Sequence, residues 1–396
     1  MGQANGLNHL TAEQIEELIA AYYGGENVHK LIERFGLDCS SNTLWRLFPA
    51  KKLDQRCRIC GAPLWEERLP RTQYLAGREH PPCCSHCGHT EGVRCRCPAC
   101  KRERAEQAIQ AAHRERAEIE EYCVRHWDYQ RRHIQPDELS LKAAVALIAL
   151  VRSGGWEDNE DVSPWGTSGA PWTPAANSFR RHLLNTLLDE LLIAPSPTAS
   201  PDAFPKSSDG GRKWDPERVN WVILHPSPSQ FLRQLVEKAE SEDWPDEWHQ
   251  SWKDLGLSLA RAECWEFCRL NLERRDLPMP GEKALNELIT DLLRHFSVSR
   301  CYRLLWMGAA RATDAMARRN LNRQHAANYV IGACQRLASS ARAEGWDLKG
   351  FARDRDLPRS EMSHVLHDVF LKHGEDGFYK CPVEWPTPDQ SEPLRV

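Results

Sequence analysis

Apolar side chains recur at helical spacing through most of the C-terminal half of the chain. The spacing predicts consecutive helices, separated by proline- or glycine-containing connections, over about 228–241, 245–274, 280–296, 298–317, 322–344 and 359–372. Residues 143–152 are predicted to form a buried helix, and residues 178–192 an amphipathic one. Two short apolar runs, 191–193 and 219–224, flank a Pro-, Ser- and Gly-rich segment and suggest the wing of a winged helix.

The N-terminal residues 11–48 show three shorter apolar periodicities, each with its own start and stop signals. Thr11 and Gln14 form a capping box for the first helix, and Asn27 caps the second. Ser40 or Ser41 is expected to cap a third helix that continues through Phe48. The short turn through residues 36–38 is of the kind that joins two helices in a DNA-binding motif.

This segment, LIAAYYGGENVHKLIERFGLDCSSNTLWRLF, resembles the helix-turn-helix of resolvase- and transposase-type DNA-binding domains. The resemblance covers about forty residues. It implies that the third helix faces DNA through Ser41, Asn42, Thr43 and Arg46, followed by Lys51 and Lys52. One departure is that this helix has a single Arg and no Lys before Lys51. A three-helix module that packs against a protein partner is the alternative.

Cysteine is concentrated in one short segment. Eight of the 15 cysteines lie between Cys57 and Cys100, and the chain starts with no basic or apolar leader that would indicate export. Metal binding is therefore expected rather than disulfide bonding. The segment has few large apolar side chains, so metal binding must supply much of its stability.

Two copies of the sequence CxxCG carry the clearest metal signal. They are Cys57-Arg-Ile-Cys60-Gly61 and Cys84-Ser-His-Cys87-Gly88. The two-residue spacing lets both thiolates of one turn reach a single ion, and the glycine permits the tight turn. The pair of knuckles resembles a zinc ribbon. That resemblance implies a closed, structural site of four thiolates, Cys57, Cys60, Cys84 and Cys87.

Three further thiols follow directly, in Cys95-Arg-Cys97-Pro-Ala-Cys100. Our preferred second site combines them with His89, and Cys83 is the other candidate for the fourth ligand. The sequence leaves open whether the pairs interleave, for instance with Cys97 and Cys100 completing the first site. One or two Zn²⁺ ions are expected, with an iron–sulfur cluster as the less favoured alternative.

Charge is distributed unevenly around a net value of −4. Residues 41–104 carry 13 basic against 6 acidic side chains, and residues 296–360 carry 12 against 5, whereas the middle of the chain is acidic. Both basic regions suit contact with nucleic acid. The longest apolar run, 143–151, is about half of what a bilayer span requires, so a cytoplasmic protein without membrane partners is expected.

Catalytic signals are weak. The chain lacks GxxxxGK[ST], GxGxxG after a strand, HExxH and GxSxG, which argues against nucleotide-driven motors, dinucleotide oxidoreductases and the common hydrolases. The segment Arg319-Asn320-Leu-Asn-Arg-Gln-His325 resembles the motif of HEPN-type ribonucleases. In that family, Arg and His from two protomers cleave RNA without metal, which would make Arg319 and His325 catalytic. The alternative is that a helix break at 320–322 makes these residues a cap and a turn.

The sequence therefore predicts a mainly α-helical protein. Its expected domains are a helix-turn-helix (1–52), a zinc ribbon (53–104), a connector helix (105–136), a winged-helix domain (137–226), a helical bundle (227–382) and a flexible tail (383–396). The expected function is zinc-stabilised binding of nucleic acid, DNA rather than RNA, in gene regulation, a mobile element or antiviral defence. The helical body would bind a protein partner or self-associate. One alternative is an effector with a HEPN-like ribonuclease bundle, so the sequence leaves open whether the protein is an enzyme. The other is a scaffold whose zinc ribbon docks a protein partner.

Overall fold

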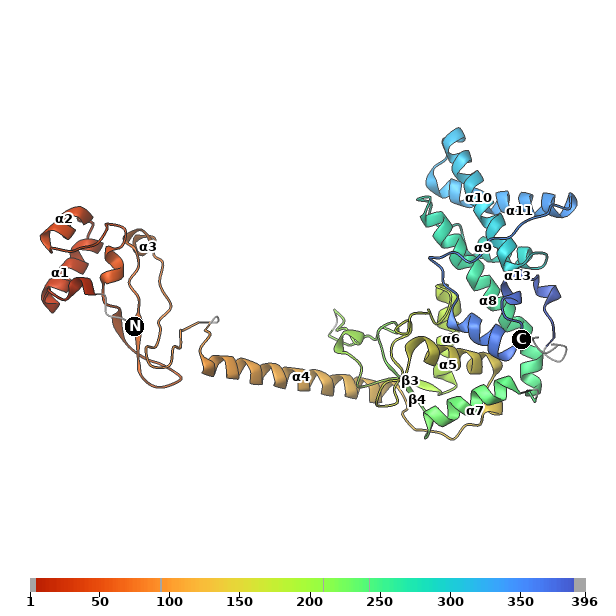
Figure 1. Cartoon of the computed structure of the whole chain (residues 1–396), viewed down its shortest axis with the longest axis horizontal. Helices are drawn as coiled ribbons and strands as arrows, with labels where there is room; N and C mark the ends of the chain where they lie inside the picture. The colour runs from red at the N-terminus through yellow and green to blue at the C-terminus, as the bar shows by residue number, and fades with distance from the viewer. Residues whose placement is uncertain (1–4, 93–94, 209, 242, 388–396) are drawn as a thin grey trace. The chain divides into compact units, whose positions relative to one another are not determined.

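The computed structural model describes residues 5–92, 95–208, 210–241 and 243–387. It is mainly helical, as the sequence predicts. The chain forms two compact units, Met1–Arg114 (unit 1) and Glu115–Val396 (unit 2), and the boundary between them falls within helix α4 (Figure 1). None of the described helices is both long and apolar enough to cross a membrane.

Unit 1 begins with a helical segment, residues 5–48. It contains the 3-10 helix η1 (Asn5–Leu7), α1 (Ala12–Tyr23), α2 (Val28–Arg34) and the 3-10 helix η2 (Leu44–Leu47). The predicted capping box is present, because the Thr11 hydroxyl and the Gln14 side chain each accept a backbone N–H of the other residue. Asn27 caps α2 through the His29 N–H, as predicted. A small core fills the space between these helices, formed by Leu7, Leu18, Ile19, Tyr22, Leu31, Phe35, Leu37, Leu44 and Phe48.

The third helix of this segment differs from the prediction. It is a four-residue 3-10 helix, and neither Ser40 nor Ser41 caps it. The Ser40 and Thr43 hydroxyls lie 2.8 Å apart, and the Thr43 hydroxyl also donates to the Ser40 carbonyl. These local side-chain hydrogen bonds stabilise a turn at the position where a longer α-helix was predicted to begin.

The second part of unit 1 is the Cys-rich segment, residues 51–100. Strands β1 (Lys51–Arg56) and β2 (Pro63–Glu66) pair antiparallel, and the short helix α3 (Arg71–Leu75) follows. Isolated bridges extend the pairing from Trp65 to Cys83 and from Cys83 to Thr90. The Tyr23 hydroxyl donates to the Leu69 carbonyl at 2.6 Å, which joins the Cys-rich segment to the helical one.

Helix α4 (Pro98–His126) corresponds to the predicted connector helix (105–136), but it begins before residue 105 and ends at His126. Two interactions explain the early end. The Asp128 carboxylate accepts the Gln130 N–H at 2.9 Å, which forms a local turn. The Arg132 N–H donates to the Leu224 carbonyl, so this stretch of backbone bonds to a distant segment instead of continuing the helix.

The first half of unit 2 combines buried helices with a small sheet. The elements are η3 (Pro136–Glu138), α5 (Leu141–Gly154), α6 (Asn177–Asp189), β3 (Ile193–Pro195), η4 (Pro201–Ala203) and β4 (Trp221–Ile223). The two predicted apolar runs do pair, as the antiparallel strands β3 and β4. Both strands are almost wholly buried. A wing that contacts nucleic acid is solvent-exposed, so this burial does not favour a winged helix, and that assignment stays a prediction.

The second half of unit 2 is helical at the predicted positions. It contains α7 (Pro228–Glu240), α8 (Asp246–Glu273), α9 (Glu282–Leu293), α10 (Val298–Arg319), α11 (Arg323–Ala343) and α12 (Glu361–His364), then the π-helix η5 (Val365–Phe370), α13 (Asp376–Tyr379) and η6 (Pro382–Glu384). The sequence did not indicate the π-helix. Of the predicted tail, residues 388–396 lie outside the described residues. One continuous hydrophobic core extends from Ile119 to Trp385 and joins both halves of the unit.

Candidate metal centres

The two CxxCG knuckles of the Cys-rich segment have the same backbone geometry. In each, the glycine N–H donates to the carbonyl of the first cysteine, Gly61 to Cys57 at 2.8 Å and Gly88 to Cys84 at 2.9 Å. Gly61 has φ +74° and Gly88 has φ +68°, so both occupy the left-handed region that favours glycine. The first knuckle closes the turn between β1 and β2, and the second follows the bridge residue Cys83.

The four thiols of these knuckles come together at one point. The sulfur atoms of Cys57 and Cys87 lie 3.5 Å apart, and those of Cys60 and Cys84 lie 3.4 Å apart. A disulfide would bring two sulfurs to about 2 Å, whereas four thiolates around one Zn²⁺ stand just under about 4 Å apart. All four ligand atoms lie within 4.8 Å of one another, so the set could hold a metal ion.

The thiols of this set do not have uniform acidity. A hydrogen bond from the Cys87 backbone N–H lowers the pKa of Cys84 to about 6. Burial raises the pKa of Cys87 to about 12. The turn therefore stabilises one thiolate already, and a bound cation would stabilise the others, because cysteine binds metal as the thiolate.

A second set consists of His89, Cys95, Cys97 and Cys100, the combination preferred from the sequence. The His89 Nδ1 atom lies 3.3 Å from the sulfurs of Cys95 and Cys100 and 3.8 Å from that of Cys97. All four side chains are buried. Cys83 belongs to neither set, and Cys97 and Cys100 do not join the first, so the alternative pairings left open by the sequence do not occur.

Backbone and side-chain groups surround this second set. The Thr90 and Cys97 N–H groups both donate to the Cys95 sulfur, and they outweigh the effect of burial and lower the pKa of Cys95 to about 6. Burial raises the pKa of Cys100 to about 11. The Arg58 guanidinium donates to the Cys100 sulfur at 3.3 Å and also pairs with Glu103.

The other nitrogen of His89, Nε2, is buried and makes no hydrogen bond with the described residues. It lies 3.4 Å from a carboxylate oxygen of Glu91. A carboxylate behind a ligating imidazole is a common arrangement around protein metals, because it fixes the orientation and tautomer of the ring. The geometry therefore points Nδ1 at the three sulfurs and Nε2 at Glu91. With four protein ligands each, neither set leaves an open position for a substrate, so both suit structural metal rather than catalysis.

The residues predicted to contact nucleic acid differ in exposure and in the local bonds that they make. Asn42, Arg46, Lys51 and Lys52 are exposed. Thr43 is engaged in the turn with Ser40, and the Asn42 carbonyl accepts the Trp45 indole N–H at 3.1 Å. Ser41 is partly buried.

A groove of about 930 Å³ in unit 1 was not foreseen from the sequence. Its walls come from the helical segment and from the Cys-rich segment, and they include Leu10, Trp45, Phe48, Trp65, Arg46 and Arg68. Residues so far apart in the chain give no local signal that they share a surface.

The weak catalytic candidates of unit 2 flank a turn. Arg319 is the last residue of α10, and Asn320 caps that helix in the left-handed conformation. His325 lies in the first turn of α11, and its N–H donates to the N-cap residue Asn322. The helix break proposed from the sequence is therefore present. No hydrogen bond or ion pair joins the Arg319 and His325 side chains within the part of the chain that the structure describes.

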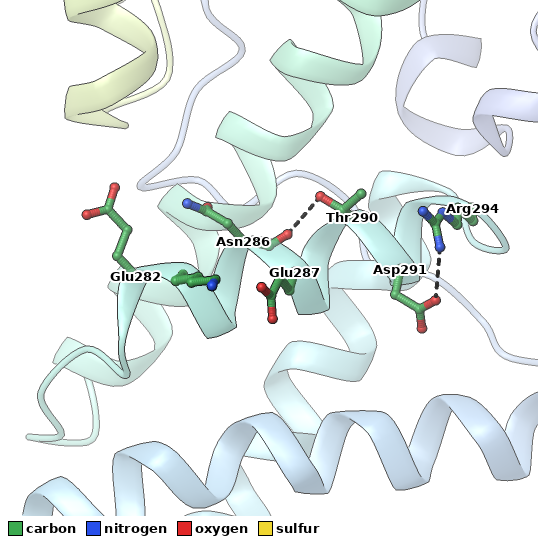
Figure 2. Close-up of a pocket in the computed structure, with 7 residues that line it drawn as sticks. Glu282, Asn286, Glu287, Thr290, Asp291 and Arg294 are labelled. Carbon is green, nitrogen blue, oxygen red and sulfur yellow. Dashed lines mark hydrogen bonds and ion pairs between the residues drawn. The ribbon is translucent and has the colours of Figure 1, made fainter.

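Polar side chains also line a groove of about 790 Å³ along the outer face of α9 (Figure 2). Its residues are exposed or half-buried positions of α9 and its C-cap, and Asp291 pairs with the cap residue Arg294. The carboxylates of Glu282, Glu287 and Asp291 stand apart along the helix in Figure 2. Within the described residues, only the two Cys-containing sets gather ligand atoms closely enough for a metal.

A buried histidine pair near the π-helix also escaped the sequence analysis. His367 Nδ1 and His373 Nε2 lie 2.7 Å apart, and the two rings are stacked. Burial lowers the pKa of His373 to about 4 and holds the pKa of His367 well below its ordinary value. Both rings are therefore neutral in the folded protein near neutral pH.

Comparison of the chain with known protein families, with characterised proteins and with solved structures finds no match.

Proposed function

We propose that the protein binds DNA through unit 1 and that two structural Zn²⁺ ions stabilise the binding surface. The observation that carries the proposal is the pair of four-ligand sets, Cys57/Cys60/Cys84/Cys87 and His89/Cys95/Cys97/Cys100, within a segment whose exposed described residues include six Lys or Arg against three Asp or Glu. Metal sites of this kind give a short segment a fixed shape without a large core.

Zinc is the metal that the donor sets favour. Four thiolates, or three thiolates and one imidazole, in a closed tetrahedral arrangement are typical of structural zinc sites. Iron–sulfur clusters usually take cysteine alone, so the imidazole in the second set argues against them. Each ion would be held entirely by protein ligands.

Contacts to the phosphate backbone would come first from Lys51 and Lys52. Both are exposed at the start of β1, a few residues after the exposed Arg46. Lysine and arginine neutralise phosphates regardless of sequence. The four-residue η2 offers a shorter surface to a DNA groove than the helix expected from the helix-turn-helix resemblance, so readout of base edges by Ser41, Asn42 and Thr43 is the smaller part of the proposal.

The test measures binding of the full-length protein to duplex DNA over a range of salt concentrations, with the metal content recorded. We expect affinity to fall steeply with salt, and the double variant Lys51→Ala, Lys52→Ala to reduce both the affinity and the salt slope. The double variant Lys253→Ala, Lys283→Ala removes the same charge from exposed lysines of unit 2 and serves as the control. No binding at low salt by a folded, zinc-loaded protein would overturn the proposal.

Protein docking is the second candidate, because of the apolar groove in unit 1. A groove lined by Leu10, Trp45 and Trp65 suits the apolar side chains of a peptide better than phosphates. A Trp65→Ala variant with unchanged DNA affinity and lost binding to a co-purifying protein would favour this candidate. Roles in gene regulation, in a mobile element or in defence against foreign nucleic acid all fit the DNA-binding proposal.

A further inference from the structure

Trp306, on α10, is a large aromatic side chain at the surface of unit 2. It is 40 % exposed, whereas six of the thirteen tryptophans of this unit are buried. Its indole N–H has no hydrogen-bond partner within the described part of the chain. It lines a groove of about 620 Å³, a size typical of ligand pockets, together with Phe351 and residues near the C-terminal end of α8.

Two arginines from different elements lie against this indole. The guanidinium carbons of Arg275 and Arg303 are each 5.6 Å from the centre of the Trp306 ring. Arg303 also lies 5.1 Å from the ring of Phe351, which meets Trp306 edge-on. The result is a surface of alternating aromatic and guanidinium planes, which we call the Trp306 platform: Arg275, Arg303, Trp306 and Phe351.

The platform is held in place by its surroundings. The Phe351 N–H donates to the Ser299 carbonyl at 3.0 Å, and the Ser299 hydroxyl donates back to the Phe351 carbonyl at 2.6 Å. The Asn271 side chain and carbonyl both accept hydrogen bonds from Arg275. A platform fixed in this way loses little conformational entropy when a ligand binds.

The charges around the groove leave the platform cationic. Arg274 forms ion pairs with Asp354 and Asp356, and Arg353 pairs with Glu263. Those carboxylates are therefore engaged, and Arg355 adds an exposed positive charge beside Asp356. Arg275 and Arg303 have no carboxylate partner among the described residues. Burial, and then the charge of Arg274, lowers the pKa of Arg275, as expected for a guanidinium without a counter-ion.

We propose that the Trp306 platform binds single-stranded nucleic acid, with a base stacked on Trp306 and phosphates bound by Arg275 and Arg303. Stacking on an exposed aromatic ring beside cationic side chains is the general means by which proteins hold single strands. A duplex presents no free base face, so an unpaired strand is the matching ligand. The site lies in unit 2 and does not depend on the metal-binding segment.

The experiment uses the full-length protein carrying Lys51→Ala and Lys52→Ala, so that binding through unit 1 is weakened in every sample. The probe is a labelled single-stranded oligonucleotide of mixed sequence, about ten nucleotides long. We expect Trp306→Ala to reduce its affinity about tenfold, Trp306→Phe to retain most of it, and Arg303→Gln to reduce both the affinity and its salt dependence.

Trp346→Ala is the matched control. Trp346 is similarly exposed, at 37 %, but its indole bonds to Glu344 and no arginine stacks on it among the described residues. Equal affinities of the Trp306→Ala and Trp346→Ala variants for the strand would overturn the proposal. So would a single nucleotide that binds as tightly as the strand, which would assign the site to a free nucleotide. An acidic peptide that binds more tightly and shows the same Trp306 dependence would assign it to a protein.

Failure of this proposal is distinguishable from failure of the DNA-binding proposal. The inference about unit 2 is tested with a single-stranded probe and substitutions of Trp306. The DNA-binding proposal is tested with duplex DNA and substitutions of Lys51 and Lys52. A protein that binds duplex normally and ignores Trp306 substitutions would disprove only the inference about unit 2.

Discussion

Most of the buried side chains in residues 51–100 are thiols and an imidazole that could hold metal ions, whereas most of those in unit 2 are aliphatic or aromatic. The Cys-rich segment buries Cys57, Cys84, His89, Cys95, Cys97 and Cys100, and beside them only Leu64 and Leu69 among its described residues. Unit 2 buries one continuous cluster that includes Trp172, Trp221 and Trp248. With metal bound as proposed, the first arrangement would gain its stability from coordination, whereas the second gains it from apolar burial, so the two parts should respond to different perturbations.

The largest expected effect is the loss of one metal ligand. Cys84→Ser should abolish metal binding at the first set and unfold the Cys-rich segment, because structural zinc supplies on the order of 10 kcal/mol to such a fold. Metal analysis and amide hydrogen exchange measure both effects, and exchange in unit 2 should not change. The neighbouring Cys83 is not a ligand, so Cys83→Ser should retain the metal. Full protection from hydrogen exchange in the Cys-rich segment of a metal-free Cys84→Ser protein would show that metal coordination does not stabilise this segment.

The converse substitution removes a core residue of unit 2. Trp248 is fully buried, and its indole N–H donates to the Leu139 carbonyl at 2.8 Å. Trp248→Ala should lower the free energy of unfolding of unit 2 by about 3–5 kcal/mol. Urea unfolding measures this change, and the metal content should remain that of the unsubstituted protein. Trp346→Ala, on the surface, should change the free energy by less than about 0.5 kcal/mol.

Acid should destabilise unit 2 through the buried histidine pair. The pKa of His373 is about 4 in the folded protein, against about 6.5 in an unfolded chain. The stability gained from keeping this ring neutral is therefore complete above pH 6.5 and is lost as the pH falls from about 6.5 to about 4, by up to about 3 kcal/mol. Urea unfolding of unit 2 across this range measures the loss.

His373→Gln should reduce that pH dependence without abolishing it, because burial still holds the pKa of His367 well below its ordinary value. An unchanged slope in the His373→Gln protein would exclude this histidine as the cause.

The smallest expected effect concerns the helical segment of unit 1, which has an apolar core of its own. Thr11→Ala removes the capping box of α1 and should cost about 1 kcal/mol. Hydrogen exchange of α1 measures it. Because Thr11 contacts no metal ligand, the metal content should remain unchanged. A loss of metal in the Thr11→Ala protein would mean that the two segments of unit 1 fold as one cooperative unit.

Much of the architecture could be predicted from local patterns. The helices α7 to α11 lie where apolar residues recur at helical spacing, and Thr11 and Asn27 cap the helices that they were predicted to cap. The two ligand sets could also be predicted, because each CxxC pair lies within one turn and His89 is close in sequence to Cys95. The metal itself, the helix-turn-helix and the function in DNA binding stay predictions.

Other features depended on interactions that helical periodicity and residue spacing do not reveal. The end of α4 is set in part by a bond from Arg132 to Leu224, and the His367–His373 pair involves a π-helix that periodicity does not reveal. Local bonds between Ser40 and Thr43 shortened the third helix of unit 1. Composition and spacing alone could not indicate which of these competing interactions would form.

The sequence by itself determined the helical periodicity, the caps and the spacing of the metal ligands, because each of these depends on residues a few positions apart. Only the tertiary structure decided which exposed side chains share a surface. Arg275, just after α8, and Trp306 on α10 meet because the two helices pack together. Helix packing follows from the whole buried core, so no local pattern could have placed them side by side.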